Sequence, residues 1–129
     1  MKQSLVLAIL MSLVPSVVPA ANQDLPRVLI IGDSISLDYT PFVIEALKGR
    51  AVVEHNRSPN NAGDTVIGLK NIDNWLGDRR WDVIHFNWGL WDICHRVEGK
   101  RDLAGPITAT PEEYEERLTK LVERLGQTG

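Results

Sequence analysis

The stretch Val28-Leu29-Ile30-Ile31-Gly32-Asp33-Ser34 carries the strongest structural signal in the chain. Its first four residues form an unbroken apolar run, and three of them are β-branched, which is typical of a strand buried on both faces of a parallel sheet. Gly32 allows a sharp turn after that strand, because glycine has no Cβ to clash with neighbouring atoms. We therefore expect Ser34 to begin a helix at the carboxyl end of the strand, where parallel sheets bind ligands.

Two interpretations of Ser34 follow from this position. The start of a helix offers free backbone N–H groups and a favourable dipole, so a serine hydroxyl there is well placed to attack a carbonyl and form a stabilised oxyanion. In the alternative, Asp33 or Ser34 serves only as a cap for the helix.

The rest of the chain repeats the alternation of strand and helix. Further strands are predicted at 51–55 and 81–87, and helices at about 39–47, 65–76 and 111–125. Strands that alternate with helices form a parallel sheet with helices on both faces. The sequence thus predicts a three-layer α/β/α fold, and between the last strand and the last helix it predicts a long irregular loop at 89–105.

Several residues mark the expected helix ends. Pro41 suits the first turn of the first helix, and Asp64 is a plausible N-cap of the second. Thr110 and Glu113 are spaced as a capping box around Pro111 at the start of the last helix.

Residues 1–20 have the features of a secretory signal peptide. Lys2 gives a positive start, an apolar stretch follows, and small residues precede a cleavage point after Ala20. An uncleaved anchor is the alternative, but the stretch is short for a membrane span and Pro15 interrupts it. We therefore expect a secreted or periplasmic protein with no stable membrane span after cleavage, and a domain formed by residues 21–129.

Composition narrows the class of partner. The chain has 129 residues and a net charge of −3 without a basic stripe, so nothing indicates binding to nucleic acid. Its one cysteine, Cys94, predicts no internal disulfide, and a packed thiol is its ordinary role. No cluster of His, Cys and carboxylate residues has metal-ligand spacing, and we expect no cofactor. The oligomeric state is not readable from the sequence.

The block Gly32-Asp33-Ser34, placed directly after a buried-strand signal, resembles the SGNH (GDSL-type) family of esterases and lipases. The resemblance implies that Ser34 is the nucleophile and that its backbone N–H helps to bind the oxyanion, with Gly32 and Asp33 in support. A second block, Asn61-Ala62-Gly63-Asp64-Thr65, is similar to the family's second motif. It implies that the N–H of Gly63 is another oxyanion donor, although Gly63 also suits a simple turn before a helix.

The third block departs from the family pattern. Gly89 and Asp92 match Gly-x-Asn-Asp, with Asp92 in support of the site, but Trp91 stands where the oxyanion-binding asparagine is expected. An indole N–H can donate one hydrogen bond, so Trp91 is either a donor or an apolar wall of the site. Asn87 is a competing donor just upstream.

The fourth block of the family, Asp-x-x-His, supplies the general base and has no match here. His55 and His85 fall in predicted strands and are expected to be structural, which leaves His95 on the long loop as the one candidate base. The resemblance therefore implies the N-terminal portion of an SGNH domain, with about three of five strands and little esterase activity alone.

The sequence is compatible with three functions. The first is an exported serine ester hydrolase that cleaves a small-molecule acyl ester or a carbohydrate O-acetyl ester. The second is a non-catalytic module that binds a glycan or lipid through Trp88 and Trp91. The third, a flavodoxin-like phosphate or nucleotide binder, lacks both Gly-x-Gly-x-x-Gly and a Walker lysine.

Overall fold

The computed structural model describes residues 25–128. Its sheet strands are β1 (Arg27–Ile31), β2 (Val52–His55) and β3 (Val83–Phe86), and its helices are α1 (Ser34–Ala46), α2 (Thr65–Leu76) and α3 (Pro111–Gly126). Two short strands, β4 (Arg96–Val97) and β5 (Lys100–Arg101), form a separate hairpin. The predicted signal peptide lies outside the described residues.

The three-stranded sheet is parallel, as the sequence predicts, with β1 in the centre of the order β2-β1-β3. Ile30 is the register point that matters for the site, because it faces His55 of β2 on one side and His85 of β3 on the other. The central position of β1 explains its continuous apolar run, since both of its faces are covered.

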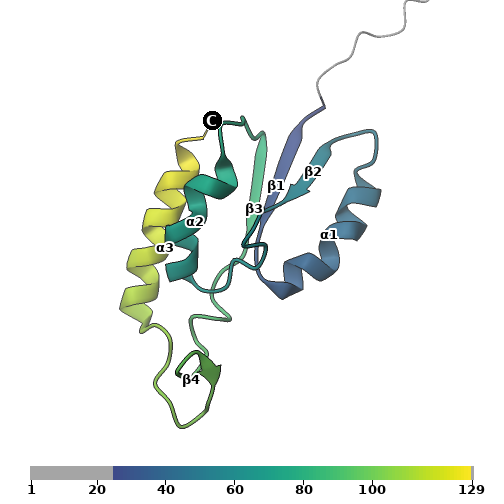
Figure 1. Cartoon of the computed structure of the whole chain (residues 1–129). Coiled ribbons are helices and arrows are strands. Elements are labelled where there is room, and N and C mark those ends of the chain that lie inside the picture. Colours follow the sequence, from purple (N-terminus) through teal and green to yellow (C-terminus); the bar gives the residue numbers. More distant parts are fainter. Residues whose placement is uncertain (1–24, 129) are drawn as a thin grey trace, which may run out of the picture.

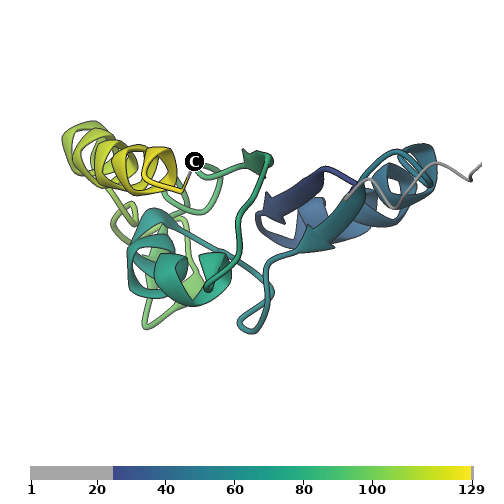
Figure 2. The same cartoon turned by 90° about the horizontal axis from the view of Figure 1, so that it is seen from above.

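Helices lie on both sides of the sheet, with α1 on one face and α2 and α3 together on the other (Figures 1 and 2). The main core lies on the side of α2 and α3 and contains Leu29 and Ile31 of β1 with Trp75 of α2 and Leu121 of α3. The predicted α/β architecture with a parallel sheet is therefore confirmed for the described residues. None of their helices combines the length and the apolar character that a membrane crossing needs.

Helix α1 begins at Ser34, as expected, but the position predicted for Pro41 is wrong. The helix runs without a break from Ser34 to Ala46, so Pro41 lies in its interior and not in its first turn. Proline has no N–H to donate to the carbonyl four residues earlier. One residue before it, the Thr40 hydroxyl donates to the carbonyl of Ser36 at 2.6 Å, which is a different acceptor from the Leu37 carbonyl that Pro41 leaves without its usual N–H partner.

The loop predicted at 89–105 contains more order than expected. Strands β4 and β5 pair antiparallel within it, and His95 forms an isolated bridge with Ile107. The hairpin lies at the end of the molecule opposite the C-terminus (Figure 1). Its strands have only two residues each, which is too short for an alternating apolar pattern to reveal them in the sequence.

Helix α3 has the predicted capping box. The Thr110 hydroxyl accepts from the Glu113 N–H at 3.2 Å, and the Glu113 carboxylate accepts from the Thr110 N–H at 2.9 Å. We expect Thr110→Ala to lower the free energy of unfolding by about 1 kcal/mol. Urea unfolding followed by circular dichroism measures this loss, and an unchanged midpoint would show that the cap contributes nothing.

Candidate functional site

The turn after β1 presents Ser34 at the surface and holds Asp33 inside. Asp33 is the N-cap of α1 and accepts from the Ile35 N–H at 3.0 Å, while Ser34 is exposed as the first residue of the helix. Capping is thus the role of Asp33. Within residues 25–128 the Ser34 hydroxyl has no hydrogen-bond partner, since the bonds at this turn are made by Asp33 and Ser36.

Gly32 packs directly against the segments that follow the other two strands. Its N–H donates to the Asn56 side chain at 3.1 Å, and its carbonyl accepts from the Ala62 N–H at 2.8 Å. A Cβ at this position would meet the Asn87 Oδ1 atom and would lie 2.7 Å from the Ser36 Cβ. The turn after β1 therefore contacts the loops after β2 and β3, which brings three of the sequence blocks to one edge of the sheet.

Asn87 lies against this turn. Its Nδ2 donates to the Asp33 Oδ1 atom at 3.3 Å, and its Oδ1 is buried without a partner in the described structure. The geometry gives Asn87 a role in holding the cap residue, and its one observed donor bond is directed at Asp33. Asn87 would have to give up its hydrogen bond to Asp33 before its amide could donate to an oxyanion.

Gly63 adopts the left-handed backbone conformation, with φ of +54°, in the loop that leads to α2. Its N–H donates to the Asn61 side chain at 2.9 Å. The amide to which the resemblance gives an oxyanion role is therefore engaged within its own loop. The Asn61 side chain has to move, or share the proton, before Gly63 can bind an oxyanion.

Trp91 and Asp92 have separate roles in the segment after β3. The Arg96 guanidinium lies over the Trp91 ring, 4.3 Å from its centroid, and Trp91 is half-buried. Asp92 is fully buried and accepts from the backbone N–H and the hydroxyl of Thr65, at 3.1 and 2.5 Å. Asp92 thus anchors this segment to the first residue of α2.

The three histidines all have partners other than Ser34. His55 Nε2 lies 2.6 Å from the Ser36 Oγ, and His85 Nε2 lies 2.9 Å from the Tyr39 hydroxyl. His95 Nδ1 lies 2.6 Å from the carbonyl of Gly105, so it must be a donor there. Two of these bonds fasten α1 to the sheet through side chains one helical turn apart.

The pair of Ser36 and His55 is the feature that the sequence did not reveal. Ser36 is fully buried and donates to the carbonyl of Asp33 at 2.7 Å, so it cannot reach a substrate. The pair instead braces the turn that carries Asp33 and Ser34. Nineteen positions separate the two residues, and only the pairing of β1 with β2 brings them together.

Burial lowers the pKa of the His55 imidazole below its ordinary value of 6.5, and its backbone bond to Asn56 opposes this in part. The unfolded chain therefore binds a proton at His55 more readily than the folded chain does. Stability from this residue is fully present above pH 6.5 and is lost as the pH falls through the lower, folded pKa. We expect His55→Gln to unfold with a weaker pH dependence over this window, measured as the difference in urea midpoint between about pH 7.5 and pH 5. Equal pH dependence in both proteins would contradict this.

Comparisons with known proteins identify no relative. No protein-family model matches the chain, and neither the curated proteins nor the solved structures contain a match. Among residues 25–128 there is also no group of three or more His, Cys, Asp or Glu side chains arranged to hold a metal ion.

Proposed function

We propose that this chain carries the nucleophile and part of the oxyanion site of an exported serine ester hydrolase of the SGNH type. The observation that carries the proposal is the Ser34 hydroxyl, which is exposed and unbonded at the start of a helix that follows a buried central strand. Asp33 takes over the capping role, so the hydroxyl has no structural task that would occupy it. The substrate class is an acyl ester of a small molecule or of a carbohydrate.

Backbone donors at this turn support the proposal. The Ser34 N–H has no acceptor within the described residues, and it lies in the first turn of α1, where the helix dipole favours negative charge. We assign three further donors to the site: the Gly63 amide once it leaves Asn61, the Asn87 side chain once it leaves Asp33, and the Trp91 indole N–H. One oxyanion donor is typically worth about 3 kcal/mol of transition-state stabilisation.

None of the described histidines is placed to act as the general base for Ser34. His55, His85 and His95 bond to Ser36, Tyr39 and Gly105, respectively. Loss of the histidine from a serine triad typically lowers the rate about a millionfold. We therefore expect very slow turnover by this chain and design the test around acylation with an added base.

The test is acetylation of the chain by p-nitrophenyl acetate in the presence of imidazole, followed by intact mass and peptide mapping. We expect the acetyl group to accumulate on Ser34 and to disappear in Ser34→Ala. Ser58→Ala is the matched control, because Ser58 is also an exposed serine but lies in the loop after β2. Unchanged acetylation of Ser34→Ala, or labelling of Ser58 at the same rate as Ser34, would refute the assignment of the nucleophile.

The alternative of a glycan- or lipid-binding module receives less support from the structure. Trp88 packs against Phe86 and the core, and its indole N–H donates to the carbonyl of Ala62 at 3.4 Å. Trp91 has one face beneath Arg96. The two rings that would form a binding platform are therefore largely occupied by contacts within the chain.

A further inference from the structure

A hollow of about 420 Å³ lies between the segment after β3 and the β4–β5 hairpin. Its apolar lining comes from Leu90, Ile93 and Leu103, which are all exposed, with Ile93 at 67% and Leu103 at 91%. The volume lies within the range of pockets that hold small organic ligands. Large apolar side chains gathered around one hollow favour a ligand with an aliphatic part, because its burial would remove them from water.

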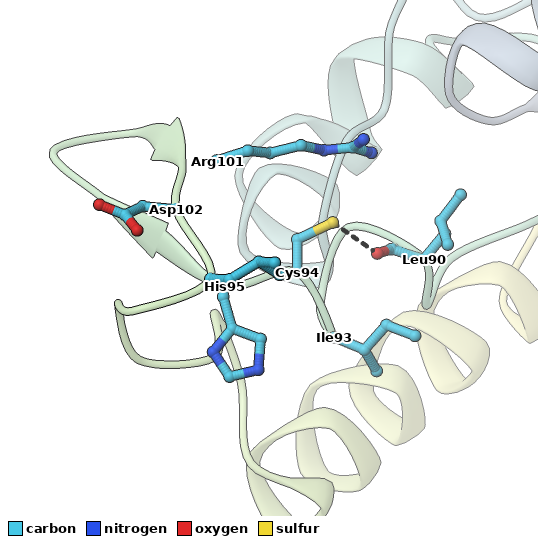
Figure 3. A pocket seen from close by; sticks show the side chains of 7 residues that line it. Leu90, Ile93, Cys94, His95, Arg101 and Asp102 are labelled. Atoms are coloured by element: carbon cyan, nitrogen blue, oxygen red, sulfur yellow. Dashed lines mark hydrogen bonds between the residues drawn. The ribbon is translucent and has the colours of Figure 1, made fainter.

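Most polar groups around the hollow are already engaged. The Cys94 thiol donates to the carbonyl of Leu90 at 3.1 Å, and the Asp102 carboxylate accepts from the Ala104 N–H at 3.0 Å. The His95 ring is tied to the carbonyl of Gly105. Figure 3 shows the side chains of His95 and Asp102 directed away from the group formed by Cys94 and Leu90.

Arg101 is the exception. Its side chain extends from β5 toward the side of the hollow where Cys94 and Leu90 lie (Figure 3). No carboxylate among residues 25–128 forms a salt bridge with it. A guanidinium beside an apolar lining complements a ligand with an anionic head and an apolar body, because its fork of donors matches a carboxylate.

We propose that this hollow binds an amphipathic carboxylate of the fatty-acid class. The carboxylate pairs with the Arg101 guanidinium, and the aliphatic chain lies against Leu90, Ile93 and Leu103. Ser34 does not line this hollow, so the proposal of a carboxylate site does not depend on the proposed esterase activity.

The test is isothermal titration of the full chain with decanoate, below the concentration at which it forms micelles. We expect saturable binding that Arg101→Gln weakens by about tenfold, the lower end of what a hydrogen bond to a charged group contributes, because Arg101 is exposed to water. Lys100→Gln is the matched control. This substitution removes the same charge from the same hairpin, but Lys100 does not line the hollow. Leu103→Asn should also weaken the binding of decanoate. Because the Leu103 side chain is highly exposed, we expect this variant to fold normally.

Decanol separates the two parts of the site. It shares the aliphatic chain but has no charge, so its affinity should be unchanged in Arg101→Gln and reduced in Leu103→Asn. The proposal is overturned if decanoate shows no saturable binding, or if Lys100→Gln weakens it as much as Arg101→Gln. It is also overturned if the chain is a dimer that Leu103→Asn dissociates while decanoate has no effect, since a second copy would then cover the hollow. Retention of decanoate binding in Ser34→Ala keeps this result separate from the test of the nucleophile.

Discussion

Gly32→Ala is expected to destabilise the folded chain by about 3 kcal/mol, the upper end of the usual cost of overpacking. The added methyl group would meet the Asn87 side chain and would lie 2.6 Å from the Ser36 hydroxyl oxygen and 2.7 Å from the Ser36 Cβ. The Asn87 amide is the end of a side chain and can shift in part. Ser36 belongs to α1, so relief of that contact requires the first turn of the helix to move away from the sheet.

Urea unfolding followed by circular dichroism measures this effect, with Gly126→Ala as the matched control. Gly126 is the last residue of α3, and a Cβ there meets nothing within 4 Å. We expect the control to be neutral or slightly stabilised, because alanine favours the helix by up to about 1 kcal/mol over glycine. Similar midpoints for the two variants would show that Gly32 is not tightly packed.

Leu121→Ala is expected to destabilise the chain by about 2–5 kcal/mol, as large-to-small changes in a core do. Leu121 is fully buried and joins α3 to the core that α2 and β1 share. The two helices approach closely at Gly68, where an added Cβ would lie 3.1 Å from a Leu121 methyl group. A cavity at this contact would loosen α3 from α2.

Val122→Ala is the control for this prediction. Val122 follows Leu121 on the same helix but is 48% exposed, so its truncation should change the unfolding free energy by less than about 1 kcal/mol. A comparison of thermal midpoints and urea midpoints for both variants tests the difference. Equal losses would mean that α3 is not held by the face that carries Leu121.

Strong local patterns predicted most of the fold. The run from Val28 to Ile31 forms the central strand, and the box of Thr110 and Glu113 begins α3 as expected. Asp64 caps α2 through the Ile67 N–H, as expected. These signals work because each depends on the chemistry of residues that are near one another in the chain.

The errors arose where neighbours in space outweighed the local pattern. Pro41 suggested a helix start, yet α1 begins seven residues earlier because Asp33 supplies a cap directly after β1. The β4–β5 hairpin was assigned to irregular loop, because two-residue strands leave no periodicity to detect.

For the candidate site, the sequence predicted which segments meet but not how their donors are used. Gly32, Asn87 and Ala62 do come together at the end of β1. The Gly63 amide bonds to Asn61, and the Asn87 amide bonds to Asp33. Both bonds depend on loop conformations that no spacing in the sequence encodes. The partner of His55 likewise depends on the register between β1 and β2.

The sequence by itself determined the order of the three sheet strands and the three helices, the caps of α2 and α3, and the place of Ser34 at the start of α1. These follow from apolar periodicity and from side chains that bond to their own backbone within a few residues. Only the tertiary structure decided that β1 lies between β2 and β3, that Asp92 anchors α2, and that Arg101 lies beside an apolar hollow with no salt-bridge partner among residues 25–128. The physical reason is that strand pairing and the meeting of charges across loops depend on distances between segments far apart in the chain.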